Sequence, residues 1–193
     1  PPPPEHVGSL MANLVEYMTA DQDYPELVSA AIAHYQFETI HPFKDGNGRM
    51  GRLLVPLYLM TKGVIPRAIL YLSVFFESHR EEYYDRLKRV STHGDWEGWI
   101  LFFAEAVRSR SQDSATKVGR ILGLRERFMA DVRNGTRSQP ALSAIDLFMR
   151  DVFITLPDLE RFAHCSYNAA RTAIEHLERL EILRPVQGQY PAT

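Results

Sequence analysis

Along most of the chain, apolar residues recur every three or four positions, which is the spacing that places them on one face of an α-helix. In the first half of the chain this spacing predicts helices over residues 5–19, 26–39, 48–62, 72–76 and 79–92. A long helical pattern then runs from residue 96 to Asn134-Gly135, with or without a break around residues 109–114. The chain is therefore predicted to be mainly helical.

The pattern changes after Ser138. We expect helices over residues 141–149, 157–163 and 167–180, with Ser166 as the N-cap of the last, since serine is a favoured capping residue. A β-branched stretch lies at residues 152–155, and a strand is predicted to start at Ile182-Leu183, where Gly188 could turn it. This order of helices and strands is that of a winged helix-turn-helix module.

Two features of the first half affect the expected core. The helix over residues 48–62 is apolar nearly all round, so we expect it to be central. Pro56 falls inside this helix and removes a backbone donor, which predicts a kink or a local irregularity.

The composition narrows the class of protein without identifying it. The 193 residues are 45% hydrophobic and 24% charged, as in an ordinary globular protein, and the net charge of −2 gives no argument for a nucleic-acid or membrane partner. The single cysteine, Cys165, excludes an internal disulfide and a cysteine-built metal site, which fits a reducing, cytoplasmic compartment. No apolar run is long enough to span a bilayer.

The richest chemistry lies between His41 and Arg52, in the sequence His-Pro-Phe-Lys-Asp-Gly-Asn-Gly-Arg-Met-Gly-Arg. Glycines at 46 and 48 let backbone N–H groups approach an anion closely, and a helix starting there adds unpaired donors and the positive end of its dipole. A histidine next to such a loop is suited to general base catalysis near neutral pH. The segment therefore predicts a phosphate site with a base beside it.

This run resembles the signature of Fic-domain proteins, His-Pro-Phe-x-(Asp/Glu)-Gly-Asn-Gly-Arg-x-x-Arg, at every specified position. The flanks agree with the same family, with His34-Tyr35-Gln36-Phe37-Glu38 upstream and Tyr83-Tyr84 and Gly94-Asp95-Trp96 downstream. The resemblance implies an all-α fold in which a Fic helical bundle is followed by a small winged helix-turn-helix domain. We expect a catalytic domain over residues 1–110, a helical linker over 111–137 and the winged module over 138–193, with the family's flap hairpin and inhibitory region upstream of Pro1.

The resemblance also implies an activity, namely transfer of AMP from ATP to a Tyr, Thr or Ser hydroxyl of a target protein or of the chain itself, with release of pyrophosphate. His41 is then the general base and Asp45 the ligand of Mg²⁺. The nucleotide would be held by the two motif arginines, the glycine loop and residues of the flanking helices: Gln36, Gly46, Asn47, Gly48, Arg49, Arg52, Tyr83 and Tyr84. For Tyr83 and Tyr84, half-buried packing is an equally good reading, because adjacent tyrosines on a helix commonly pack against the core.

Two alternatives stay open. Family members also remove AMP, transfer other nucleotidyl groups or phosphorylate. The C-terminal module could make the protein a DNA-binding regulator, with Asn168, Arg171, Thr172 and Arg179 on its recognition helix. However, residues 138–193 carry five arginines, no lysine and seven acidic residues, which favours a protein-docking or dimerising role over DNA binding. A catalytically idle binding module conflicts with the complete motif.

Overall fold

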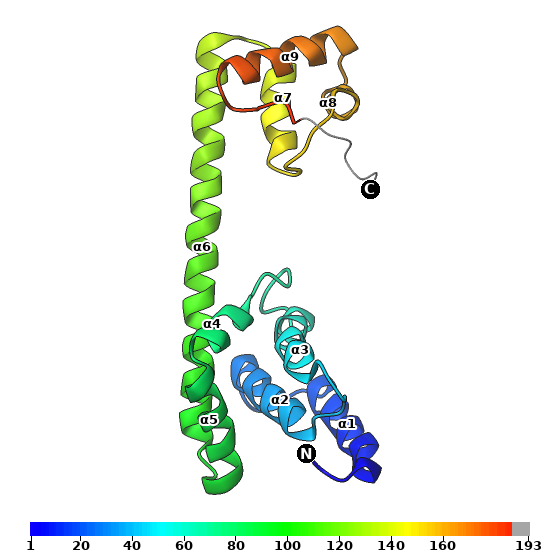
Figure 1. Ribbon diagram of the computed structural model, residues 1–193, viewed down its shortest axis with the longest axis vertical. Coiled ribbons are helices and arrows are strands. Elements are labelled where there is room, and N and C mark those ends of the chain that lie inside the picture. Colours follow the sequence, from blue (N-terminus) through cyan, green and yellow to red (C-terminus); the bar gives the residue numbers. More distant parts are fainter. Residues whose placement is uncertain (187–193) are drawn as a thin grey trace. The chain divides into compact units, whose positions relative to one another are not determined.

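A computed structural model describes residues 1–186, and within them it contains nine α-helices and no β-strand (Figure 1). The all-α prediction is confirmed. The chain divides into two compact units, residues 1–116 and residues 117 onward, and the long helix α6 (Trp96–Gly135) contributes to both. No helix of the described residues combines the length and apolar character that a membrane span needs.

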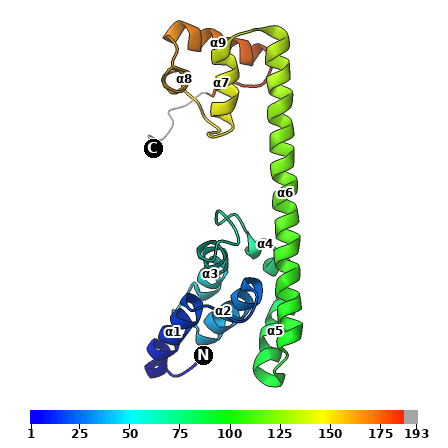
Figure 2. The same cartoon turned by 180° about the vertical axis from the view of Figure 1, so that it is seen from behind.

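The first unit begins with three helices in which α2 packs against both α1 and α3 (Figures 1 and 2). Each predicted helix of this region is found with ends shifted by at most two residues. The bounds are α1 Pro4–Thr19, α2 Glu26–Ile40, α3 Asn47–Thr61, α4 Leu72–Ser78 and α5 Arg80–His93, followed by the start of α6.

Helix α2, and not α3 as predicted, is the central helix of this bundle. Buried residues lie on every side of α2, whereas one side of α3 exposes a row of apolar side chains. That row consists of Met50, Leu53, Leu57 and Met60. The prediction failed because an apolar composition does not say which side a neighbouring helix covers. Pro56 is buried within α3, which runs past it without interruption.

The main core of the first unit is rich in aromatic side chains. Trp99 and Phe103 of α6 are completely buried, and the indole Nε1–H of Trp99 donates a 2.9 Å hydrogen bond to the backbone carbonyl of Ala31 on α2. This bond satisfies the one polar group of a buried tryptophan. The aromatic core thus fixes α2 relative to the start of α6.

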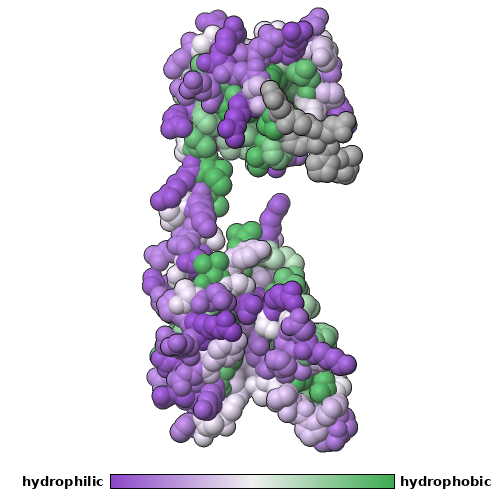
Figure 3. Space-filling model, in the orientation of Figure 1, coloured by the Kyte–Doolittle hydropathy of each residue, from purple (hydrophilic) through white to green (hydrophobic). Residues whose placement is uncertain are grey.

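In the space-filling view, hydrophilic side chains cover most of the visible surface, with scattered hydrophobic ones (Figure 3).

Helix α6 is continuous through residues 109–114, so the optional break is absent. This segment contains neither glycine nor proline, and Arg110 forms a 2.5 Å ion pair with Asp113 one turn away, an arrangement that supports a helix.

The second unit packs helices α7 (Gln139–Phe148), α8 (Leu156–Ala163) and α9 (Tyr167–Arg179) against the last turns of α6. Its core joins Met129 and Val132 of α6 to Ile145, Leu159 and Leu177. Each of the three helices has a side-chain N-cap: Ser138, Thr155 and, as predicted, Ser166.

The strands of a wing are not seen in the part of this unit that the structure describes. Residues 152–155 are irregular and lead to Thr155, which caps α8. The backbone N–H groups of Ile182 and Leu183, which a strand would use for pairing, instead lie 3.0 and 3.4 Å from the carbonyl oxygen of Leu177 at the end of α9. The predicted turn at Gly188 lies outside the described residues, so the winged module is not confirmed.

Candidate active site

The predicted phosphate loop lines a pocket of about 310 Å³ in the first unit. Part of the lining is the loop between α2 and α3 with the first turns of α3, and the rest comes from α4 and α5. Of the predicted site residues, only Gln36 is not among those that line it. The lining residues are His41, Lys44, Asp45, Gly46, Asn47, Gly48, Arg49, Arg52, Phe76, Glu77, Arg80, Tyr83 and Tyr84.

His41 is the residue that ends α2, and its backbone is left-handed, with φ 53° and ψ 57°. Its imidazole is exposed, and Nδ1 lies 3.4 Å from the backbone carbonyl oxygen of Glu38 in a long hydrogen bond. A carbonyl only accepts, so in the neutral ring Nδ1 carries the hydrogen. The lone pair is then on Nε2. In this tautomer Nε2 can accept a proton from a hydroxyl, as a general base must.

The loop is held closed by Asn47, which is almost fully buried. Its Oδ1 accepts a 2.8 Å hydrogen bond from the backbone N–H of Phe43, and its Nδ2 donates a 2.6 Å bond to the carbonyl of the same residue. Both ends of the amide are therefore used inside the loop. Asn47 was expected to hold the nucleotide, whereas its side-chain amide braces the loop.

Helix α3 begins directly at the pocket. Gly46 is its N-cap with φ 85°, a conformation that favours glycine, and no side chain caps the helix. The first backbone bond of the helix comes from Met50 N–H to the carbonyl of Gly46, so the N–H groups of residues 47–49 have no intrahelical acceptor. Three N–H groups without an intrahelical acceptor and the positive end of the helix dipole thus lie at the pocket, where an anion would be stabilised.

Cationic side chains outnumber acidic ones around the pocket, with four Lys or Arg against two carboxylates. Arg49 lies 3.4 Å from Asp45, with both side chains mostly exposed, so this pair is weak. Arg52 is better fixed, because its Nε donates a 3.1 Å hydrogen bond to the Ser73 hydroxyl. The site is suited to a polyanion.

The two tyrosines have different surroundings. Tyr83 is buried, its ring stacks on Phe76 at 4.7 Å, and burial raises the pKa of its hydroxyl. Tyr84 is 55% exposed, and the guanidinium carbon of Arg80 lies 5.8 Å from its ring centre. Of the two, Tyr84 is therefore the tyrosine whose side chain is exposed at the pocket.

Tyr83 belongs to a buried network centred on His34, which has no exposed surface. Nδ1 of His34 lies 2.9 Å from the carbonyl of Gly51, and Nε2 lies 3.0 Å from the Tyr83 hydroxyl. Burial lowers the pKa of His34 to about 4. Because the ring is neutral and must donate to a carbonyl through Nδ1, the Tyr83 O–H donates to Nε2. His34 therefore joins α2, α3 and α5 and is a core residue.

Glu38 lies on α2 between His34 and the C-cap residue His41, with 11% of its side chain exposed, and among the described residues its Oε1 has no hydrogen-bond partner. Burial raises the pKa of this carboxyl, against the opposing effect of the positive charge on Arg52. A Cβ at Gly51 would overlap Oε1 of Glu38 and lie 3.1 Å from Cδ1 of Phe37. A side chain at position 51 would therefore have to displace the partly buried Glu38 carboxylate and would crowd the Phe37 ring.

The loop supplies one carboxylate that could bind a metal ion, that of Asp45. Asp45 is almost fully exposed, with Oδ1 accepting a 2.7 Å bond from the Gly46 N–H. Within the described residues no group of three or more His, Cys, Asp or Glu side chains could hold an ion. Mg²⁺ is commonly bound by one or two carboxylates together with substrate phosphates, so Asp45 fits an ion that arrives with a polyphosphate.

Sequence reasoning missed the α4–α5 side of the pocket, namely Phe76, Glu77 and Arg80, and assigned nothing to Lys44. The one available signal was the four-residue spacing of Arg80 and Tyr84, which places both on one face of a helix.

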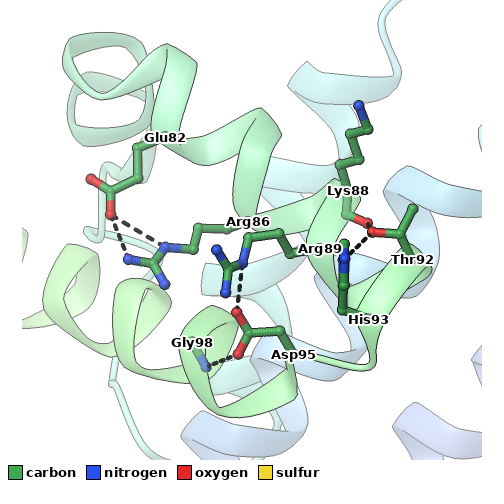
Figure 4. Close-up of polar contacts among 8 residues, drawn as sticks. All are labelled: Glu82, Arg86, Lys88, Arg89, Thr92, His93, Asp95 and Gly98. Atoms are coloured by element: carbon green, nitrogen blue, oxygen red, sulfur yellow. Dashed lines mark hydrogen bonds and ion pairs between the residues drawn. The ribbon is translucent and has the colours of Figure 1, made fainter.

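A second pocket, of about 320 Å³, is lined by residues of α4, α5 and α6. They include the aromatic side chains of Phe75 and Phe102. The polar groups in and around it are already paired with one another. Arg86 bonds Glu82 at 2.9 Å, Arg89 bonds Asp95 at 2.8 Å, and Asp95 accepts from the Gly98 N–H at 3.0 Å (Figure 4). The pocket at the loop between α2 and α3 instead contains the N–H groups of residues 47–49, which lack an intrahelical acceptor, and the His41 imidazole. We take this pocket as the candidate active site.

Comparison with known proteins gives one family. Residues 1–59 match the Fic/DOC family model. The chain is 37% identical over 107 residues to protein adenylyltransferase Fic of Culex quinquefasciatus, covering 54% of this chain and 20% of that protein. It is 32% identical over 146 residues to protein adenylyltransferase fic-1 of Caenorhabditis briggsae, covering 75% of this chain and 26% of that protein. The chain thus spans about a quarter or less of the length of these two relatives.

A solved structure is similar over most of the chain. The crystal structure of a Fic family protein from Desulfovibrio desulfuricans G20 matches with a TM-score of 0.58 and 26% sequence identity, covering 93% of this chain and 50% of that one. The similarity therefore extends beyond the motif to the helical fold.

Proposed function

We propose that this chain is a protein adenylyltransferase of the Fic/DOC family, whose model residues 1–59 match. It would transfer AMP from ATP to a Tyr, Thr or Ser hydroxyl of a target protein or of itself. The observation that carries the proposal is the presence in one pocket of an exposed imidazole, an uncapped helix N-terminus and several arginines. These groups match the needs of nucleotidyl transfer, in which a polyphosphate is held and a hydroxyl loses its proton.

In this proposal the polyphosphate of ATP binds at the start of α3. The N–H groups of residues 47–49 donate to phosphate oxygens, while Gly46 and Gly48 allow close approach. Asn47 contributes its backbone N–H, because its amide is occupied by Phe43. Arg49 and Arg52 neutralise the charge that develops on the departing pyrophosphate.

His41 acts as the general base. Its Nε2 takes the proton of the target hydroxyl, the hydroxyl oxygen attacks the α-phosphorus, and the bond from that phosphorus to the oxygen bridging the α- and β-phosphates breaks. Pyrophosphate leaves with the bonding electrons. The Glu38 carbonyl holds the Nδ1 hydrogen throughout, which stabilises the imidazolium that forms.

Asp45 would hold Mg²⁺, whose chemistry here would be to neutralise negative charge on the phosphates. Tyr83 and Tyr84 line the same pocket from α5, and we place the adenosine end of the nucleotide beside them. For Gln36 the nucleotide-binding role stays a prediction, and its position outside the pocket lining gives that role no support.

The test is labelling of the protein with ATP and Mg²⁺. ATP labelled in the α-phosphate should label wild-type protein, ATP labelled in the γ-phosphate should not, and a His41→Ala variant should lose the signal. Transfer of the γ-label would instead establish phosphorylation. Release of AMP from a previously modified protein, without labelling, would establish the reverse reaction.

Two finer proposals accompany this function. The second unit would be a protein-docking or dimerising module, because its charge does not favour a polyanion. The location would be cytoplasmic, because a chain with the single cysteine Cys165 needs no oxidising compartment.

A further inference from the structure

Helix α3 carries a row of aliphatic side chains that the rest of residues 1–186 leaves partly exposed. Four of them, Met50, Leu53, Leu57 and Met60, are between 38% and 48% exposed, and Val64, just after the helix, is 50% exposed. A contiguous apolar patch on a protein surface commonly marks a site of protein association. We propose that this row is the contact through which two copies of the chain associate, with their α3 helices antiparallel.

The spacing of the row is that of a contact between two helices. Its four helical members are three, four and three residues apart, which places them on one side of the helix, as at the a and d positions of a coiled coil. This series of intervals is the same when it is read from either end of the helix. Two antiparallel copies therefore match along the whole row: Met50 packs against Met60 of the second copy, and Leu53 against Leu57. Such a contact is symmetric and closes with two copies.

The middle of the row carries no charge. Residues 53–61 of α3 include no acidic or basic side chain. The centres of protein interfaces are depleted in charged residues, since a charge buried without a partner is costly, and methionine is enriched there. A methionine stands at each end of the row, and methionine side chains adapt their shape to a neighbour. The composition of this face therefore suits contact with a second protein surface.

The charges near the two ends of α3 favour the antiparallel arrangement over the parallel one. Arg49, at the N-terminal end, is next to the row in sequence and is 76% exposed. Lys62, at the C-terminal end, donates a 2.9 Å hydrogen bond from Nζ to the backbone carbonyl of Ala20. The exposed Asp21 and Asp23 follow in the same loop. Antiparallel packing brings Arg49 of one copy towards these carboxylates of the other, whereas parallel packing would bring the two arginines together.

The size of the contact sets its expected strength. A single helix pair buries less surface than the roughly 800 Å² per partner of a standard interface, and such small contacts are typical of weak association. We therefore expect the dimer to dissociate at micromolar concentrations. The row lies wholly in the first unit, so this inference is independent of AMP transfer and of the role proposed for the second unit.

Sedimentation of the full chain at increasing concentration tests the association. We expect the average mass to rise from one chain towards two and no further. Leu57→Glu places a carboxylate against Leu53 of the second copy and should weaken the association by about tenfold or more, because an unpaired charge would be buried. The matched control is Leu101→Glu, the same substitution at a side chain of α6 that is 63% exposed and lies outside the row. The control should associate like wild type.

Cysteine pairs test the register, in a background that carries Cys165→Ser. Residues 53 and 57 of opposite copies should face each other, so a mixture of Leu53→Cys and Leu57→Cys proteins should form disulfide-linked dimers faster than either protein alone. Met50→Cys alone should not form them, since the two copies of position 50 would lie about 15 Å apart along the helix axis. Cysteine is a mild replacement, so this measurement tests the contact even where Leu57→Glu does not fold.

The inference is overturned if the chain stays monomeric at every concentration, which would leave the row to another segment or another protein. It is also overturned if Leu57→Glu associates as tightly as Leu101→Glu. Faster cross-linking of Met50→Cys alone than of the mixture would establish parallel helices and would overturn the proposed arrangement.

Discussion

Helix α2 carries two histidines in opposite surroundings. His34, in the middle of the helix, is fully buried, is neutral and has a hydrogen-bond partner for each ring nitrogen. His41, at the end of the helix, is exposed and has one long bond to a backbone carbonyl. The buried region ties α3 and α5 to α2, whereas the exposed end presents a nitrogen with a lone pair to the pocket. We therefore expect changes near His34 to affect stability and changes near His41 to affect chemistry.

The largest effect should come from the exposed end. Replacing His41 by alanine removes the base, so we expect AMP transfer to fall by about 10²- to 10⁴-fold. The midpoint of thermal unfolding should change little, because the exposed ring makes only one long bond. Labelling rates and calorimetry measure the two quantities on the same preparation. Equal labelling rates in wild type and His41→Ala would contradict the assignment of His41 as the base.

The second largest effect is expected on stability, in the buried region between α2 and α3. Gly51→Ala places a Cβ on Oε1 of Glu38 and against Phe37, so we expect the free energy of unfolding to fall by about 1–3 kcal/mol, as for other overpacked sites. Denaturant titration measures this change. Gly119→Ala is the control, since a Cβ at this exposed position of α6 meets nothing within 4 Å. The control should be unchanged or slightly more stable, because alanine favours a helix.

A pH dependence should also come from His34. Its pKa of about 4 is below the ordinary value of 6.5, so between these values the unfolded chain binds the proton and the folded chain does not. Stability should therefore fall as the pH is lowered, by about 2 kcal/mol between pH 7 and pH 5. The measurement compares denaturant unfolding of wild type and His34→Gln at both pH values.

Two comparisons isolate the contribution of His34 to this pH dependence. Glu38 acts in the opposite direction, because its raised pKa makes the folded chain gain stability as the pH falls, and it is present in both proteins. His6→Gln, at an exposed position, should keep the wild-type dependence. A His34→Gln variant with the same pH dependence as wild type would show that His34 is not a buried neutral base.

A smaller loss is expected for Tyr83→Phe. The change removes the donor to Nε2 of His34 and leaves a buried acceptor without a partner, which typically costs about 1 kcal/mol or somewhat more. Thermal unfolding measures it. Tyr71→Phe, on an exposed tyrosine, should have no effect. An unchanged midpoint in Tyr83→Phe would mean that the network does not hold α5 in place.

The smallest effect on stability is expected at Arg49. Its pair with Asp45 is long and exposed, so Arg49→Ala should change the free energy of unfolding by less than about 0.5 kcal/mol. Affinity for ATP should nevertheless fall about tenfold, since one charge-assisted contact is lost. A large drop in stability without loss of affinity would reverse the expected division between the two regions.

The sequence by itself determined the features that depend on neighbouring residues. The helices of the first unit could be predicted to within two residues, because their periodicity is local. The loop from His41 to Gly48 could be predicted for the same reason, since glycine at 46 and a helix starting at 47 are consecutive requirements of one anion site. Ser166 was also readable as a cap, because its partner, the N–H of Ala169, is three residues away.

Only the tertiary structure decided which distant groups meet. His34 joins Gly51 and Tyr83 across separations of 17 and 49 residues, and no local pattern encodes such pairings. The same holds for Arg80 and Tyr84, which line one pocket with the motif arginines because of how α5 packs in the aromatic core. A wing was predicted from β-branched composition, yet the N–H groups of residues 182 and 183 bond to the end of α9, because a strand needs a partner that composition cannot supply.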